Sequence, residues 1–204
     1  LATRHEIVRM LNWSDRFNTT YNHNLSVTSS SYEPITDAIL QLNRLLTSKS
    51  KGYIFLEGTP GSGKSTLLTQ WSRLIPEISI RYYAFDFTDP SSQLNNDSNR
   101  GDKTVFLYDV LKMMESYGFK GEGHTLLYRD YSFLKNRFQD TIKIIGKNFT
   151  ESGSKVILIV DGLDHIVREY TSCVTTLMGV LPSSNENPEG LIILLGSQYF
   201  TGLG

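Results

Sequence analysis

The feature that most constrains this chain is a glycine-rich nonapeptide, GTPGSGKST, at residues 58–66. A short apolar run, YIFLE, precedes it and is typical of a buried strand, and apolar residues at helical spacing follow it up to Pro76. Where a glycine-rich turn joins a strand to a helix, the backbone N–H groups of the turn and of the first helical turn point toward the same site. The segment therefore predicts a binding site for an anion such as phosphate.

The rest of the chain alternates between the two periodicities. Apolar residues three or four positions apart predict helices, the first with Pro34 in its first turn, at residues 35–46, 67–75, 106–117, 131–149 and 171–181. Apolar or β-branched runs predict strands at residues 53–57, 78–87, 156–160 and 191–195. Continuous apolar runs are typical of parallel strands that are buried on both faces. The expected fold is α/β, a three-layer sandwich with a mainly parallel sheet.

Composition excludes several classes of protein. The 204 residues include 20 Lys and Arg against 21 Asp and Glu, and 39% are hydrophobic. Neither a disordered tail nor a nucleic-acid binder that works by bulk charge has this balance. The aliphatic runs are far shorter than the roughly 20 residues of a membrane span. We expect a cytoplasmic protein without a membrane partner or direct nucleic-acid binding, and the lone Cys173 permits no internal disulfide.

The ends of the chain suggest a domain boundary. Asn, Ser and Thr dominate residues 18–31, as in a loop or linker. We expect an N-terminal helix and polar linker at residues 1–31 and a folded core at residues 32–204. Because the chain starts at Leu1 and stops shortly after its last apolar run, that core is expected to be an excerpt that is incomplete at its carboxyl end.

The nonapeptide matches G-x-x-x-x-G-K-[ST] at every fixed position. In this pattern the Lys64 ammonium reaches the β and γ phosphates and the Ser65 hydroxyl binds Mg²⁺. A dinucleotide fingerprint would need a third glycine where Thr66 stands, so a nucleoside triphosphate is the better ligand. We expect ATP with Mg²⁺. The predicted phosphate-binding residues are Gly58, Thr59, Pro60, Gly61, Ser62, Gly63, Lys64, Ser65 and Thr66.

An acidic partner for the metal is expected at the end of another buried strand, and Asp161 stands there. Ser65 and Asp161 are thus the predicted magnesium site, with Asp161 acting through water. Asp164 or His165 is predicted to orient or deprotonate the attacking water, so Lys64, Asp164 and His165 are the predicted catalytic residues. Alternatively, Asp164 is the N-cap of a helix that begins at His165, and His165 is a surface residue beside that helix.

Two polar residues, Ser197 and Gln198, follow the last predicted strand. Polar groups just beyond the carboxyl ends of parallel strands face the ligand crevice. Ser197 and Gln198 are therefore predicted to sense the γ-phosphate or to position water. The alternative is that they are simple loop residues.

Taken together, GTPGSGKST, VILIVDGLDH and LIILLGSQ resemble the STAND class of P-loop ATPases, close to the NACHT group and to the ATPase modules of prokaryotic antiviral defence proteins. The resemblance implies an extra strand between the phosphate-loop strand and the acidic strand, and a helical lid outside this chain. It also implies a nucleotide-controlled change from monomer to homo-oligomer, started by a protein trigger that other domains sense. His165 stands where the family often has Glu, and Gln198 where it often has Arg, so hydrolysis is expected to be slow or regulatory.

Other functions remain open at this point. Because of His165, one alternative is a non-hydrolytic scaffold with bound ADP or ATP. Another is a remodelling ATPase of the AAA+ type, for which Arg168 is a conceivable arginine finger. Residues 99–102, Asn-Arg-Gly-Asp, faintly resemble the guanine-reading N-K-x-D motif, but they precede the acidic strand and carry Arg in place of Lys. Their position argues against guanine specificity, which competition between ATP and GTP would test.

Overall fold

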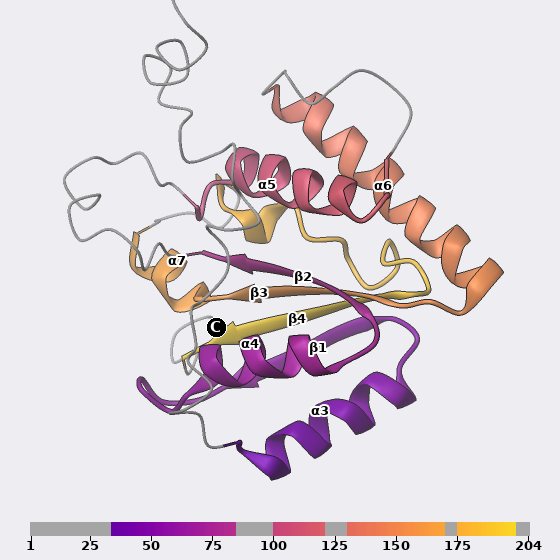
Figure 1. Ribbon diagram of the computed structural model, residues 1–204. Helices are drawn as coiled ribbons and strands as arrows, with labels where there is room; N and C mark the ends of the chain where they lie inside the picture. Colours follow the sequence, from indigo (N-terminus) through magenta and orange to yellow (C-terminus); the bar gives the residue numbers. More distant parts are fainter. Residues whose placement is uncertain (1–33, 85–99, 121–129, 170–174, 199–204) are drawn as a thin grey trace, which may run out of the picture.

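The computed structural model describes residues 34–84, 100–120, 130–169 and 175–198. Within them, four parallel strands form one sheet in the order β1-β4-β3-β2 (Figure 1). The strands are β1 (Gly52–Glu57), β2 (Ile78–Tyr83), β3 (Val156–Asp161) and β4 (Leu191–Ser197). β4 lies between the phosphate-loop strand and the strand that ends in Asp161. The predicted α/β class, parallel sheet and extra strand are therefore confirmed.

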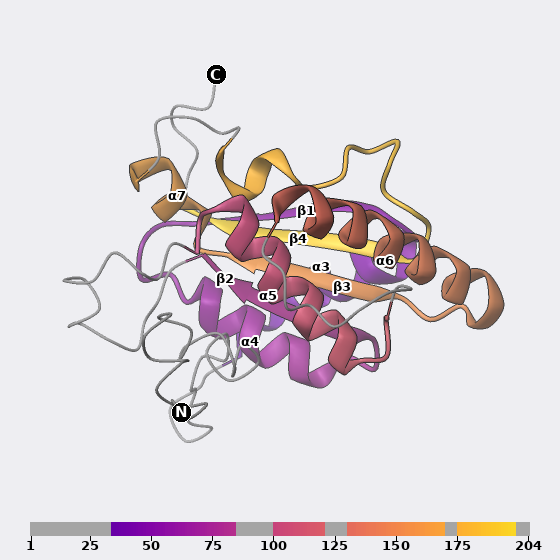
Figure 2. The ribbon, with the colours of Figure 1, turned by 90° about the horizontal axis from the view of Figure 1, so that it is seen from above.

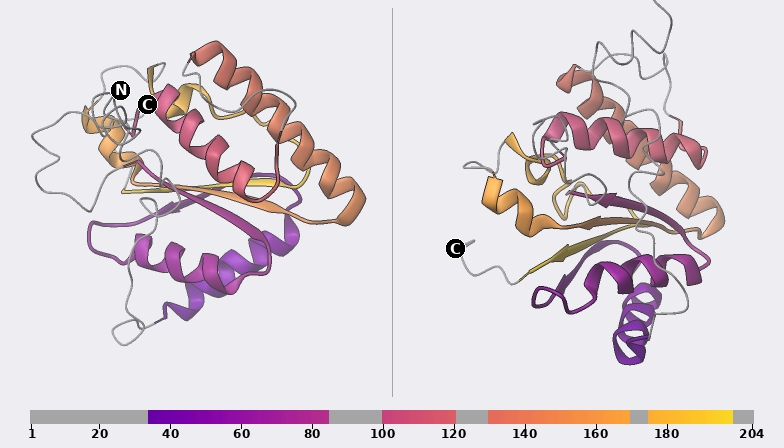
Figure 3. Two further views of the ribbon diagram at one scale, coloured as in Figure 1. Left: turned by 45° about the horizontal axis from the view of Figure 1, so that its top comes forward. Right: turned by 60° about the vertical axis from the view of Figure 1, so that its left-hand side comes forward.

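Helices cover both faces of this sheet (Figure 3). α3 (Thr36–Ser48) and α4 (Lys64–Leu74) lie on one face, and α5 (Lys103–Ser116) and α6 (Tyr131–Ser152) lie on the other. Figure 2 shows α5 and α6 over the same face, where the two helices contact one another. The four helices correspond to the first four helical patterns of the sequence.

The two central strands are apolar on both faces because both faces are covered. Every residue of β3 and β4 is buried. Along β3, Ile157 and Ile159 enter the cluster formed with α3 and α4, whereas Leu158 enters the cluster formed with α5 and α6. β1 and β2 lie at the edges of the described sheet, and Phe55 on β1 is 60% exposed.

Several predicted boundaries need correction. Pro34 precedes the N-cap residue Ile35 and does not belong to the first helical turn. A helix at residues 171–181 is wrong for the part that the structure describes. Thr176 there has extended backbone, pairs with Asp102 and caps a short 3₁₀ helix, η5 (Leu177–Gly179). The buried Leu177 and Val180 lie three positions apart, a spacing that 3₁₀ and α-helices share.

Other predictions are only partly covered. β2 ends at Tyr83, and residues 85–87 of the predicted strand lie outside the described residues. The N-terminal helix and linker predicted at residues 1–31 also lie outside them, as does Cys173. Among the described helices, none is both long and apolar enough to cross a membrane.

Candidate functional site

The carboxyl ends of the four parallel strands lie at the same edge of the sheet. The register pairs Asp161 with Gly196 on one side and with Tyr83 on the other. Backbone hydrogen bonds continue past the strands: Gly58 N donates to Ser197 O at 3.3 Å, and Gly162 N donates to Gly196 O at 3.1 Å. The phosphate loop, the acidic strand end and the end of β4 are thereby held at one edge of the sheet.

The phosphate loop depends on glycine backbone conformations. Gly61 and Gly63 have φ angles of 74° and 84°, in the region that side chains disfavour. Gly63 is the N-cap of α4, and no side chain caps this helix end. The first N–H groups of α4 therefore remain available to an anion, which the positive end of the helix dipole also attracts.

Lys64 is folded back onto the loop that precedes it. Its ammonium donates to the carbonyl oxygens of Gly58 at 2.8 Å and Thr59 at 2.9 Å, and lies 3.5 Å from the Ser62 hydroxyl. The positive charge is therefore held within the loop. When a phosphate binds there, its oxygens would accept hydrogen bonds from the ammonium in place of these carbonyl and hydroxyl oxygens. Hydrogen bonds with a charged donor or acceptor are roughly twice as strong as those between neutral groups.

Asp161 is a buried carboxyl group with an incomplete set of partners. It is 2% exposed, and its Oδ1 accepts from Gly162 N at 2.9 Å. Burial raises the pKa of Asp161, although hydrogen bonds from Ser65 and Gly162 and the charge of Lys64 oppose that rise. Among the described residues, Asp161 Oδ2 has no hydrogen-bond partner, and neither does the buried Ser197 Oγ at the end of β4.

The side-chain oxygens of Asp161 and Ser65 suit a small divalent cation. Carboxylate and hydroxyl oxygens are the hard ligands that Mg²⁺ prefers, and it usually keeps several waters as well. Asp161 and Ser65 are in hydrogen-bond contact, so both can belong to one metal shell. A cation would also satisfy the buried Oδ2 of Asp161. The residues present therefore fit the predicted Mg²⁺.

Asp164 and His165 lie at the start of α7 (Leu163–Glu169). Because this helix begins at Leu163, the alternative that Asp164 caps a helix starting at His165 is wrong. Asp164 Oδ1 accepts from the backbone N–H of Gln198 at 3.4 Å, and its Oδ2 lies 3.7 Å from His165 Nε2. The negative charge of Asp164 contributes to the raised pKa of Asp161. The structure thus brings Asp161, Asp164, His165 and Gln198 into one cluster.

Gly196 was missed by the sequence prediction. A Cβ atom at this position would lie 2.5 Å from Asp161 Oδ1 and 3.2 Å from Leu68 Cδ1. Only hydrogen at position 196 leaves room for the carboxyl group, so Gly196 shapes the site without contributing a functional group. A glycine inside the apolar run LIILLGS was the available signal, because such a glycine often marks a close approach.

Replacing Gly196 by alanine should displace the Asp161 carboxyl group and lower stability. Overpacking of this kind costs about 1–3 kcal/mol. We expect Gly196→Ala to lower the thermal midpoint and to weaken the effect of Mg²⁺ on ATP affinity. Gly146→Ala is the matched control, because its Cβ would lie 3.0 Å from Pro188 Cβ, away from the site. An unchanged Mg²⁺ effect in Gly196→Ala would contradict this account of Gly196.

Asp102 and Arg168 belong to the alternative hypotheses of a GTPase and of an AAA+ ATPase. Asp102 is the N-cap of α5, where its Oδ1 accepts from Thr104 N at 2.7 Å and Val105 N at 3.1 Å. Capping is a structural role that accounts for the acidic residue of the Asn-Arg-Gly-Asp segment. The side chain of Arg168, the conceivable arginine finger, lies outside the described residues.

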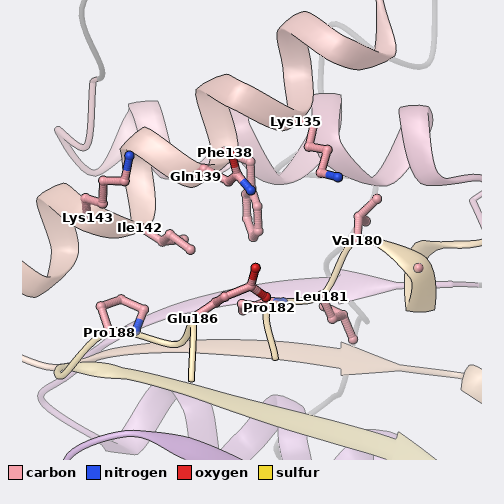
Figure 4. Close-up of a pocket in the computed structure, with 11 residues that line it drawn as sticks. Lys135, Phe138, Gln139, Ile142, Lys143, Val180, Leu181, Pro182, Glu186 and Pro188 are labelled. Carbon is pink, nitrogen blue, oxygen red and sulfur yellow. The ribbon is translucent and has the colours of Figure 1, made fainter. Parts of the chain in front are cut away.

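A separate cavity of about 380 Å³ lies on the α6 face of the sheet (Figure 4). Phe138 and Ile142 of α6 line one side, and Val180, Pro182 and Glu186 line the other. None of the predicted phosphate, metal or catalytic residues lines this cavity. The predicted nucleotide site at the carboxyl edge of the sheet is therefore separate from this cavity.

This chain has recognisable similarity to known proteins. The model of the family described as Nephrocystin 3, N-terminal matches residues 39–197. The chain is 26% identical over 179 residues to a cytoplasmic dynein heavy chain of Caenorhabditis elegans, a match that covers 84% of this chain and 4% of that protein. The solved structure of the Aeropyrum pernix ORC2 protein (ADPNP-ADP complexes) covers 82% of this chain and 43% of its own, with a TM-score of 0.42 and 16% identity.

The family match includes the phosphate loop, Asp161, Asp164 and the end of β4 at Ser197. It spans most of the chain, and the fold around these residues is that of a P-loop NTPase core. This chain belongs to the Nephrocystin 3 N-terminal family and is a NACHT-type P-loop NTPase domain.

Proposed function

We propose that this domain binds and slowly hydrolyses ATP with Mg²⁺, and that its nucleotide state controls oligomerisation of a larger signalling protein. The observation that carries the proposal is the buried Asp161 carboxyl group, which interacts with Ser65 of the phosphate loop and has an oxygen without a described partner. A structural acid would be expected to have its buried oxygens satisfied. A role in antiviral defence and a protein trigger remain predictions from the resemblance.

Each residue of the site has a chemical part in this proposal. The loop N–H groups and Lys64 bind phosphate oxygens, and Lys64 exchanges the Gly58 and Thr59 carbonyls for them. Ser65 and Asp161 hold Mg²⁺, which when bound neutralises phosphate charge. Asp164, whose Oδ1 accepts from the Gln198 N–H, orients the attacking water in this proposal. His165, whose Nε2 lies 3.7 Å from Asp164 Oδ2, offers an imidazole as an alternative proton acceptor.

A non-hydrolytic scaffold is the second candidate. His165 favours it, because a histidine beside Asp164 occupies the position where the resembled family often has a carboxylate base. In that case the nucleotide binds with Mg²⁺ and stays intact. The two candidates differ in phosphate release and not in nucleotide affinity.

Asp164→Asn tests the hydrolytic proposal. Because the amide keeps the shape of the carboxylate but accepts protons poorly, we expect phosphate release to fall roughly 10²-fold, within the range for general bases. ATP affinity should change less than about threefold, so the variant retains bound ATP. Phosphate release under single turnover and equilibrium ATP binding measure these two effects.

His165→Gln separates the two residues, since a loss only in this variant would make His165 the base. Asp161→Ala lacks the predicted metal-binding carboxylate, so its phosphate release gives the background level of the assay. Phosphate release by the unaltered full chain at that background level would contradict the hydrolytic proposal and favour the scaffold.

A further inference from the structure

A chain of hydrogen bonds joins the end of β2 to the first turn of α4. Tyr83, the last residue of β2, is 3% exposed, and its hydroxyl lies 2.6 Å from Thr69 Oγ1. Thr69 is fully buried on α4, and the same Oγ1 donates to the carbonyl oxygen of Ser65 at 2.7 Å. Tyr83 is thus linked through one side chain to the backbone of Ser65.

The direction of this chain follows from its proton count. A carbonyl oxygen only accepts, so the single hydroxyl proton of Thr69 goes to Ser65 O. Thr69 Oγ1 must then accept the proton of the Tyr83 hydroxyl. The Tyr83 hydroxyl therefore donates to Thr69, and the Thr69 hydroxyl donates to the carbonyl oxygen of Ser65.

This series of hydrogen bonds ends at Ser65, next to the predicted metal site. The Ser65 side chain lies close enough to Asp161 to oppose the rise in the pKa of its carboxyl group, and Asp161 is the register partner of Tyr83 on the neighbouring strand. Tyr83, Thr69, Ser65 and Asp161 therefore form a closed circuit between β2, α4 and β3. A shift of the first turn of α4 relative to the sheet would break this circuit.

We propose that Tyr83, acting through Thr69, is a positioning residue that holds Ser65 at Asp161 for binding of Mg²⁺ with the nucleotide. This inference rests on the proposed function. Neither residue touches the phosphates or the metal in this role. Tyr83 and Thr69 affect only the position of Ser65. Their loss should therefore reduce the increase in nucleotide affinity that Mg²⁺ produces.

The neighbouring Tyr82 offers a matched control. It is also fully buried, and its hydroxyl donates to Arg100 O at 2.6 Å. Because side chains alternate along a strand, Tyr82 lies on the α5 face, where its ring contacts Phe106. Tyr82→Phe and Tyr83→Phe each remove one buried tyrosine hydroxyl, but only the second removal reaches Ser65.

The experiment measures ATP affinity of the full chain in Mg²⁺ and in EDTA, together with the thermal midpoint. In Tyr83→Phe and Thr69→Val we expect the ratio of the two affinities to fall about three- to tenfold, the effect of one lost hydrogen bond. Affinity in EDTA should stay unchanged. Tyr82→Phe should lower the thermal midpoint but keep the wild-type ratio, and Thr69→Ser should restore the ratio because it keeps the hydroxyl.

Different outcomes overturn different statements. A wild-type chain that binds no ATP, or binds it equally with and without Mg²⁺, overturns the proposed function and this inference with it. A wild-type Mg²⁺ effect that persists in Tyr83→Phe and Thr69→Val overturns the positioning role alone. An equal loss in Tyr82→Phe also overturns it, because the effect would then be general destabilisation. If Tyr83→Phe does not fold, the comparison of Thr69→Val with Thr69→Ser decides.

Discussion

Replacing Lys64 by alanine should abolish ATP binding at ordinary nucleotide concentrations and, with it, nucleotide-dependent assembly. The ammonium lies within the phosphate loop, 2.8 and 2.9 Å from two of its carbonyl oxygens, and is placed to transfer these hydrogen bonds to phosphate. Charge-assisted bonds contribute about 1.5–3 kcal/mol each, so the loss of two corresponds to an affinity at least roughly 10²-fold lower. Titration calorimetry measures the affinity, and light scattering with ATP measures the assembly.

Lys143→Ala is the control for the loss of a lysine. Lys143 is 76% exposed on α6, where it pairs with Asp140 at 3.0 Å, on the other face of the sheet. Its removal should leave ATP affinity and assembly unchanged. Equal nucleotide affinity and oligomeric state in Lys64→Ala and the wild-type chain would refute the nucleotide-switch proposal.

Replacing Asp161 by asparagine should abolish metal-dependent hydrolysis and, in the absence of nucleotide, stabilise the fold at neutral pH. Loss of a metal-binding carboxylate removes several kcal/mol of transition-state stabilisation, on the order of 10³-fold in rate. The gain in stability has another cause. Burial raises the pKa of Asp161, so ionising this group in the folded chain costs more free energy than in the unfolded chain.

The gain in stability of Asp161→Asn over the wild-type chain should depend on pH. Below the ordinary pKa of an aspartate the carboxyl group is protonated in both states, and Asp161→Asn should change stability little. As pH rises through the raised pKa, the wild-type chain alone loses stability, so the advantage of the variant grows and then levels off. Thermal unfolding without nucleotide between about pH 4 and pH 8 measures the difference. An advantage that shrinks as pH rises would contradict the account of Asp161.

Much of the fold was predictable because its signals are local. Strand and helix periodicities identified the four strands and four of the helices, since continuous apolar runs and helical spacings reflect burial on both faces of a parallel sheet. The segment around Thr176 was not predictable in this way. Its apolar residues match a helical spacing, but pairing between Asp102 and Thr176, distant in the chain, gives Thr176 extended backbone.

The sequence by itself determined the phosphate loop and the acidic residue opposite it. Both are short patterns whose chemistry depends on neighbouring residues: glycines that allow positive φ, a lysine, and an acid at the end of an apolar run. Only the tertiary structure decided which residues support them. Strand order and register place Gly196 against Asp161, and the packing of α4 against β2 brings Thr69 to Tyr83; both contacts join different elements of the fold. No local periodicity encodes those contacts, because they depend on how the elements pack.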